Sequence, residues 1–454
     1  MKRTKTLLAF LAVLTLTTAA KAQSSYVWAQ DTLTVAQMQE DFNYMIEQYE
    51  RIHPNPMWSL GEERYNELKQ QTLAQLDRQM PLLDFWRIIA RWNQHFDGHT
   101  QLAWPAKQSS GASENVTPFP PKSVVQYRDR KLFFGDYVGM PDSLRGCEIV
   151  AVNGHPSAEV IEAILPYVSH ESEAFINTTM LQSLNYYYDV LFGSKALVTL
   201  RYRTTSGEKT VSLDRSAITE LFQRIVDRRS PRNLPWRFYI FPEQGIALLE
   251  FNKCRPDERL EQFDSEVGTF IDSVNRLGIR HLFVDLSQNQ GGNDMFCYRF
   301  LRHIATIPDT VVLFDYASTE HGTAEPVEDR YIMTFRPKEP QYSGRLYFIQ
   351  SQFTYSAAVI LANLAKQYGF GTLIGEETGG LTTTYIRLNQ RKLPNSGLTF
   401  YCSDKQNRYL GTTGPRGVLP DIPLEIGYKY LFRSFTAEEL QQMIEMTNQK
   451  DKQQ

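Results

Sequence analysis

The hydrophobic pattern changes character along the chain. Between about residues 31 and 105, apolar positions recur at helical spacing and predict three helices. From residue 235 onward, short apolar runs alternate with helical patterns. The predicted strands are 245–251, 280–285, 310–315, 346–349 and 372–374, and the predicted helices are 260–277, 295–304 and 357–368. Such alternation predicts an α/β layer with largely parallel strands.

The segment between these two parts favours short strands. Runs at 124–127 and 131–134 predict a hairpin, and 168–192, rich in Tyr and Leu, predicts a helical insertion. The stretch 146–154 resembles the "G-D-x-I-x-x-V-N-G" segment of PDZ domains, with Cys147 in place of the aspartate. PDZ domains bind extended peptides at a sheet edge, and the alternative is a purely structural module.

The N-terminus has the pattern of a secretory signal peptide. Basic residues precede an apolar run at 7–16, and Ala20-Lys21-Ala22 forms an A-x-A cleavage signal. We therefore expect cleavage before Gln23 and a periplasmic or extracellular protein, with an uncleaved anchor as the alternative. The expected division is a signal peptide (1–22), a helical region (23–108), a PDZ-like module (109–215), a catalytic domain (230–430) and a C-terminal helix or tail (431–454).

Charge and cysteine usage exclude several classes of function. The formal net charge is −3, and without the first 22 residues 44 basic residues face 51 acidic ones, a balance of −7. This balance argues against nucleic acid or an anionic membrane as the main partner. The eight histidines and four cysteines show no clustering of metal-ligand type, so we expect no metal and no cofactor. The disulfide status is left open for Cys147, Cys254, Cys297 and Cys402.

Candidate chemistry lies at the ends of two predicted strands and in one turn. Ser356 stands between strand 346–349 and helix 357–368, either as a helix cap or as a nucleophile at a helix N-terminus. Gly291-Gly292 follow strand 280–285, either as an oxyanion-binding turn or as an ordinary tight turn. His99 lies in Asp97-Gly98-His99-Thr100, where it is either a catalytic imidazole or a surface histidine.

Three blocks together resemble the tail-specific (carboxyl-terminal processing) serine peptidases, in the branch nearer the tricorn core. Residues 285–292 are similar to "D-L-R-x-N-x-G-G", 354–358 to "T-x-S-A-[SA]", and 368–380 to "Y-G-x-x-x-x-[IV]-G-E-x-T-x-G". The resemblance implies an α/β, multidomain (α+β) protein with a ClpP/crotonase-like core. It also implies that Ser356 is the nucleophile and that Ala357, with Gly291 or Gly292, supplies the oxyanion-hole N–H groups.

The resemblance implies a Ser/His pair. The lysine base of the processing branch is missing after the "G-E-x-T" block, whereas the 97–100 motif is similar to the histidine motif of the tricorn-like branch. His99 is therefore the expected base, and Asp97, Glu376 and Glu377 are the possible orienting acids. The implied function is an exported serine endopeptidase acting on peptides or proteins through an acyl-enzyme. The alternatives are a catalytically weak relative that binds a peptide or small apolar ligand, and a PDZ-type scaffold.

Overall fold

The computed structural model describes residues 26–28, 31–108, 119–136, 139–228, 234–319, 326–410, 416–431 and 433–452. The predicted signal peptide and its cleavage site lie outside these residues. Within the described parts of the chain, no helix is long and apolar enough to cross a membrane.

The N-terminal region contains the three helices expected from the pattern. They are α1 (Val35–Ile52), α2 (Gly61–Gln75) and α3 (Leu82–Ile89), and a 3₁₀ helix, η2 (Ala90–His95), continues α3. Thr34 caps α1 through a reciprocal capping box with Gln37. The short strands here are β1 (Tyr26–Trp28), β2 (Thr32–Leu33), β3 (Met80–Pro81), β4 (Gln101–Leu102) and β5 (Ala106–Gln108).

A second module follows, built on an antiparallel sheet in the order β11-β10-β8-β7-β6, with β9 beside β8. Its strands are β6 (Val125–Arg128), β7 (Lys131–Phe134), β8 (Glu148–Val152), β9 (His155–Pro156), β10 (Leu197–Thr204) and β11 (Gly207–Asp214). Its helices are α4 (Ser157–Ile164), η3 (Leu165–Tyr167), α5 (Glu173–Phe192) and α6 (Arg215–Arg228). The predicted hairpin is present as β6–β7, and the predicted helical insertion is α5.

The remainder of the chain is organised on a sheet in the order β12-β13-β14-β17-β18-β21. All of its pairings are parallel except β12–β13. Its strands are β12 (Trp236–Phe241), β13 (Ile246–Phe251), β14 (His281–Asp285), β17 (Arg345–Gln350), β18 (Thr372–Gly375) and β21 (Ile422–Pro423), and its short 3₁₀ helices are η4 (Pro242–Gln244) and η5 (Asp257–Arg259). The helices are α7 (Leu260–Arg276), α8 (Met295–Leu301), α9 (Ala357–Tyr368) and α10 (Ala437–Asp451).

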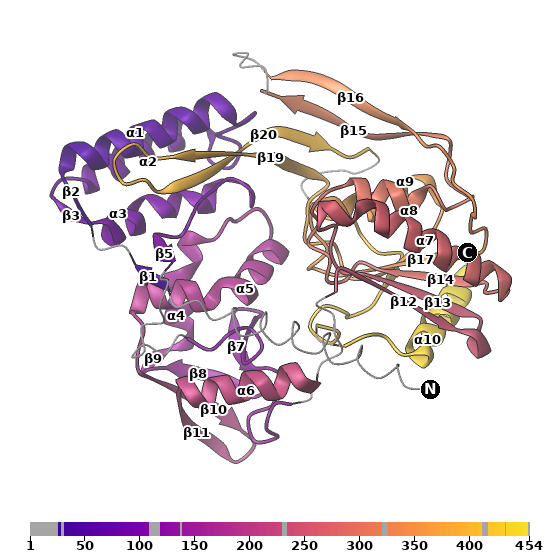
Figure 1. Ribbon diagram of the computed structural model, residues 1–454. Coiled ribbons are helices and arrows are strands. Elements are labelled where there is room, and N and C mark those ends of the chain that lie inside the picture. Colours follow the sequence, from indigo (N-terminus) through magenta and orange to yellow (C-terminus); the bar gives the residue numbers. More distant parts are fainter. Residues whose placement is uncertain are drawn as a thin grey trace, which may run out of the picture.

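Two hydrophobic clusters hold this sheet between helical layers (Figure 1). Alternate residues of β13 point to opposite faces, so Leu249 packs with residues of α7, α8 and α9, whereas Leu248 packs with α10. The α/β expectation is thereby confirmed.

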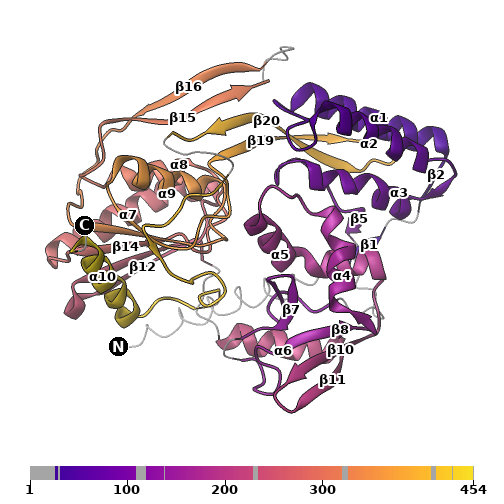
Figure 2. The ribbon, with the colours of Figure 1, turned by 180° about the vertical axis from the view of Figure 1, so that it is seen from behind.

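A third sheet connects this core to the N-terminal region. Its order is β16-β15-β20-β19, with β4 paired to β20, and its strands are β15 (Thr310–Ser318), β16 (Val327–Thr334), β19 (Thr383–Lys392) and β20 (Thr399–Arg408). The prediction that 310–315 joins the parallel layer was wrong, because β15 pairs antiparallel with both β16 and β20. Figures 1 and 2 show the β19–β20 hairpin extending from the core toward the N-terminal helices, where β20 contacts α1.

Candidate active site

Ser356 occupies a strained backbone position at the start of α9. Its φ of 53° and ψ of −124° lie in a region that residues with a side chain rarely adopt. Although it stands at the N-cap position, its side chain makes no capping hydrogen bond. Strain of this kind persists where the surrounding structure enforces it, and it is concentrated at functional sites. The hydroxyl is therefore available for chemistry rather than used to cap the helix.

The loop after β14 lies directly against Ser356. A Cβ added to Gly291, whose φ is 86°, would lie 2.7 Å from both the Ser356 Cβ and the Ala357 nitrogen. Only glycine permits so close an approach. The loop is fixed by Asn289, which accepts the Gly291 N–H through Oδ1 at 2.8 Å and the Tyr355 N–H through its backbone carbonyl at 2.9 Å.

Backbone N–H groups at this point have no hydrogen-bond acceptor within the described residues. They include those of Ala357, the first residue of α9, and of Gly292. By contrast, the Gly291 N–H is already bonded to Asn289. Of the two glycines expected to supply an oxyanion donor, Gly292 is thus the one with a free N–H.

His99 lies on a turn pinned by Asp97. The Oδ1 of Asp97 accepts the backbone N–H groups of His99 at 2.8 Å and Thr100 at 3.2 Å, and the Ser403 hydroxyl of β20 at 3.2 Å. Its Oδ2 lies 3.1 Å from His53 Nε2. Burial acts to raise the pKa of Asp97, but the hydrogen bond and charge of His53 bring it below the usual value. Asp97 is therefore ionised and holds the turn in place.

The structure brings the His99 turn to the residue before Ser356. The Tyr355 ring stacks on the imidazole with a centroid distance of 5.2 Å, and its hydroxyl lies 3.5 Å from His99 Nδ1. A Cβ added to Gly98 would lie 2.8 Å from that same hydroxyl. The chain positions flanking the expected base and the expected nucleophile are thus in contact.

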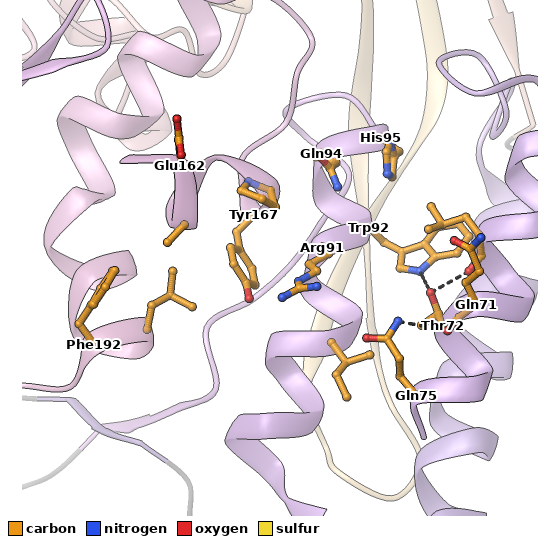
Figure 3. Close-up of a pocket in the computed structure, with 15 residues that line it drawn as sticks. Gln71, Thr72, Gln75, Arg91, Trp92, Gln94, His95, Glu162, Tyr167 and Phe192 are labelled. Atoms are coloured by element: carbon orange, nitrogen blue, oxygen red, sulfur yellow. Dashed lines mark hydrogen bonds between the residues drawn. The ribbon is translucent and has the colours of Figure 1, made fainter. Parts of the chain in front are cut away.

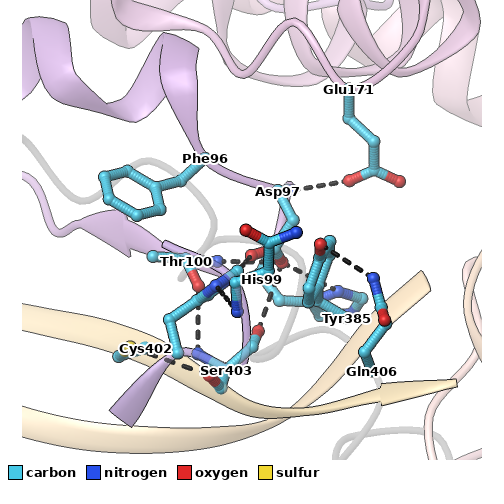
Figure 4. Close-up of polar contacts among 12 residues, drawn as sticks. Phe96, Asp97, His99, Thr100, Glu171, Tyr385, Cys402, Ser403 and Gln406 are labelled. Atoms are coloured by element: carbon cyan, nitrogen blue, oxygen red, sulfur yellow. Dashed lines mark hydrogen bonds and ion pairs between the residues drawn. The ribbon is translucent and has the colours of Figure 1, made fainter. Parts of the chain in front are cut away.

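The environment of His99 favours a neutral imidazole. Burial lowers the pKa of His99, and this outweighs the opposing effects of the Asp97 carboxylate and of a hydrogen bond to the Tyr385 carbonyl. A neutral imidazole is the form that accepts a proton. Figure 4 shows His99 in the turn between Asp97 and Thr100, with Tyr385 and Ser403 of the third sheet beside it.

The three candidate acids have different surroundings. Asp97 Oδ1 lies 3.8 Å from His99 Nδ1, beyond hydrogen-bond distance. Glu376 accepts the backbone N–H groups of Gln352, Ile426 and Gly427. Glu377 pairs with Arg416 and accepts the Gly417 N–H. Within the described residues, neither Glu376 nor Glu377 contacts His99.

A cleft of about 280 Å³ opens at this junction. Its walls include His99, Tyr355 and Gln290, which precedes Gly291, and the polar residues Thr178 and Gln182 of α5. The second module therefore contributes one wall of the cleft. Ser356, Ala357 and Gly292 do not line this cleft, so it borders the candidate base and Tyr355 but not the candidate nucleophile.

A larger cavity of about 690 Å³ lies elsewhere, between α2 and η2 on one side and α4 and η3 on the other. Figure 3 shows Arg91, Glu162 and Tyr167 among its residues. None of the residues singled out from the sequence lines it. Geometry, rather than cavity size, thus identifies the candidate site.

Sequence reasoning missed two residues of the site, Tyr355 and Glu171. Tyr355 stands at the variable position of the nucleophile block, so its motif gives no signal for it. Glu171 precedes the N-cap of α5, where acids are common for reasons of helix electrostatics alone. In the structure its carboxyl group accepts the Tyr355 hydroxyl at 3.1 Å and the Gly98 N–H at 2.6 Å.

Comparison with protein families places this arrangement in a known group. Residues 246–424 match the family model described as peptidase family S41. The match covers less than half of the chain, and we call residues 246–424 the S41 domain after this similarity. The matched segment contains the Gly291-Gly292 loop, Ser356 and the β19–β20 hairpin, whereas His99 lies outside it.

Solved structures resemble most of the chain and extend beyond residues 246–424. Mature CPAF is 13% identical with a TM-score of 0.60, covering 87% of this chain and 94% of that chain. CPAF complexed with lactacystin is 13% identical with a TM-score of 0.62, covering 91% of this chain and 99% of that chain. At this identity the likeness concerns the fold alone. No curated protein matches the sequence.

Proposed function

We propose that the protein is a serine-type endopeptidase that hydrolyses peptide or protein chains through an acyl-enzyme. The observation that carries this proposal concerns Ser356 at the start of α9. Its backbone is strained and its hydroxyl makes no capping hydrogen bond, and the preceding residue, Tyr355, contacts His99. Membership of the S41 domain in a peptidase family supports the reaction class.

The proposed chemistry follows from the roles of the groups. Ser356 Oγ attacks the carbonyl carbon of the scissile bond, and His99 accepts the hydroxyl proton. The same imidazole then gives the proton to the leaving amine, and the C–N bond breaks to leave a serine ester. Water, deprotonated by His99, hydrolyses that ester and restores the Ser356 hydroxyl.

Negative charge on the carbonyl oxygen needs donors that are fixed before the reaction. The free N–H groups of Ala357 and Gly292 are proposed to supply them, aided by the positive end of the α9 dipole. Gly291 takes a different role, since its own N–H is bonded to Asn289 and its missing side chain leaves room for Ser356.

Labelling with a fluorophosphonate probe tests the proposal. We expect the wild type to be labelled, and expect labelling and cleavage of dye-labelled casein to be lost in Ser356→Ala and His99→Ala. Ser265→Ala removes an exposed serine and retains both signals, and His155→Ala removes an exposed histidine and retains labelling. Absence of labelling and of cleavage in the wild type would instead support the ligand-binding alternative.

Two further expectations from the sequence belong to this proposal. Export predicts a mature chain that begins at Gln23, which mass spectrometry of the secreted or periplasmic protein measures. The PDZ-like segment 146–154 coincides with β8 and the turn before β9, in an antiparallel sheet flanked by α4. We propose that this module binds an extended part of the substrate, because strand addition at a sheet edge is the mode of recognition that its motif implies.

A further inference from the structure

One carboxyl group of the second module joins the two loops of the proposed site. Glu171 is 9% exposed and precedes the N-cap of α5. Its Oε2 accepts the Gly98 N–H at 2.6 Å and the Tyr355 hydroxyl at 3.1 Å. Gly98 precedes His99 and Tyr355 precedes Ser356, so Glu171 contacts the chain beside both proposed catalytic residues. Figure 4 shows Glu171 reaching the loop that carries Asp97 and His99.

The position of Glu171 is held by contacts on either side of it. Before it, the Ser169 hydroxyl donates to the Phe96 carbonyl at 2.5 Å. After it, the Thr178 hydroxyl of α5 donates to the Gln352 carbonyl at 3.1 Å. The carboxyl group is therefore fixed relative to both loops.

We propose that Glu171 and Tyr355 are positioning residues that select the tautomer of His99, an inference that rests on the proposed function and deepens it. When Glu171 is ionised it only accepts, so the Tyr355 hydroxyl donates its proton to the carboxylate. The Tyr355 oxygen is then an acceptor for His99 Nδ1–H, beside the Tyr385 carbonyl that also interacts with the imidazole. The proton of the neutral imidazole stays on Nδ1, and Nε2 keeps the lone pair that receives the Ser356 proton.

Protonation of Glu171 reverses this chain of hydrogen bonds. A carboxylic acid can donate to the Tyr355 oxygen, which turns the Tyr355 hydroxyl toward Nδ1. The imidazole proton then moves to Nε2, where it blocks the base. The 3.5 Å separation between the hydroxyl and Nδ1 is long, as is common for catalytic hydrogen bonds without a substrate.

The groups facing Glu171 set the pH at which this change occurs. Burial raises the pKa of Glu171 to about 8, and the negative Asp97 adds to this, against the hydrogen bonds from Gly98 and Tyr355. Burial raises the pKa of Tyr355 well above its usual value, so its hydroxyl keeps its proton throughout. The remaining titratable groups at this junction are His99, whose pKa is lowered, and Tyr385, whose pKa is raised by burial.

The first experiment compares Glu171→Gln with Glu173→Gln, the same change two residues later at an exposed position. We expect wild-type kcat/KM on labelled casein to rise about tenfold between pH 7 and 9, following one ionisation near 8. Glu173→Gln keeps this rise. For Glu171→Gln we expect kcat/KM to be constant over the same interval and to fall only below pH 6.5, as His99 is protonated. At pH 9 its kcat/KM is about 10- to 100-fold lower than that of wild type. An unchanged rise in Glu171→Gln would overturn the proposal.

Tyr355→Phe tests the link between the two groups. The variant keeps the ring that stacks on His99 and loses only the hydroxyl. We expect the rise near pH 8 to disappear in this variant as in Glu171→Gln. Loss of packing alone would lower the rate and leave the shape of the pH profile unchanged, and that result would also contradict the proposal.

A spectroscopic readout separates this inference from the proposed function. In protein labelled with ¹³C and ¹⁵N histidine, the His99 signal is assigned by its absence in His99→Ala. We expect its shifts to report Nδ1–H above pH 8 and to change near pH 8 in the wild type but not in Glu171→Gln. These chemical shifts can be measured whether or not the protein cleaves casein. Absence of peptidase activity would therefore refute the proposed function, while the His99 shifts would still test the tautomer switch. A His99 signal with no change near pH 8 refutes the switch.

Discussion

Replacement of Asn289 tests the proposed oxyanion site through its support. The Asn289 side chain is fully buried, with Nδ2 donating to the Phe251 carbonyl at 2.8 Å and Oδ1 accepting the Gly291 N–H at 2.8 Å. Its backbone carbonyl accepts the Tyr355 N–H at 2.9 Å. The residue thus connects β13, the glycine loop and the segment before Ser356.

The expected cost of Asn289→Ala has two parts. The buried Phe251 carbonyl and the buried Gly291 N–H both lose their hydrogen bond to the Asn289 side chain. Each loss costs about 1–3 kcal/mol, so the free energy of unfolding falls by about 2–6 kcal/mol. The loop that carries Gly292 also loses its anchor. If that loop provides an oxyanion donor, misplacing the donor lowers kcat by about 10²- to 10³-fold, or roughly 3–4 kcal/mol of transition-state stabilisation.

The assay measures both parts on one protein sample. Denaturant unfolding gives the stability, and cleavage of labelled casein at a temperature where each variant is folded gives kcat/KM. Asn363→Ala is the matched control, because Asn363 is equally buried but on α9, where, among the described residues, its side-chain amide donates to Gln367 at 3.5 Å. We expect Asn363→Ala to retain kcat/KM within about threefold of wild type, the factor that roughly 0.6 kcal/mol represents. Equal kcat/KM for the two variants would refute the placement of the oxyanion site.

Three further predictions concern the framework. Asp41→Ala removes the acceptor of the Asn395 and Ser396 backbone N–H groups at the tip of the β19–β20 hairpin. The free energy of unfolding, measured with denaturant, should fall by about 3 kcal/mol, and a change below about 0.5 kcal/mol would contradict this. Cys147 is half-buried, whereas the other three thiols are buried, and burial raises the pKa of Cys297 well above its usual value. Ellman's reagent should therefore titrate one thiol in the folded protein and four after unfolding. Burial acts to raise the pKa of Glu439, but Arg433 and neighbouring donors lower it to about 2. Glu439→Gln should therefore lower Tm at pH 7, and the Tm difference between wild type and variant should narrow as the pH falls from 4.5 toward 2.

The elements that could be predicted from the sequence are those encoded locally. Around Ser356 the strand, the turn and the helix follow from periodicity, and Gly369 ends α9 with a left-handed φ of 65°, as its position suggests. The Gly291-Gly292 turn follows β14 for the same local reasons. The local structure around the proposed nucleophile and oxyanion donors could therefore be predicted from residues 246–424 alone.

The parts that escaped prediction depend on contacts between distant residues. Glu171 bonds Gly98, 73 residues away, and Tyr355, 184 residues away, and no short motif records either contact. The orienting acid was sought among Asp97, Glu376 and Glu377, which lie next to recognisable motifs. The third sheet was missed for a similar reason, since the apolar run at 310–315 has the pattern of a parallel strand, and its partners β16 and β20 are what distinguish β15.

Long-range contacts also join the turn that carries His99, outside the S41 segment, to strands inside that segment. The β19–β20 hairpin leaves the core, pairs with β4, and holds the His99 turn through Ser403, whose N–H donates to Thr100 Oγ1 at 3.0 Å and whose hydroxyl donates to Asp97. The proposed base is thus positioned by strands that lie within residues 246–424, whereas Ser356 lies at the start of α9 against the glycine loop. A chain cut by a protease between residues 393 and 398 would accordingly lose its base while its Ser356 loop stays folded. Such a cut should abolish labelling by the fluorophosphonate probe before the core unfolds, whereas labelling that persists until the core melts would show that the hairpin does not position His99.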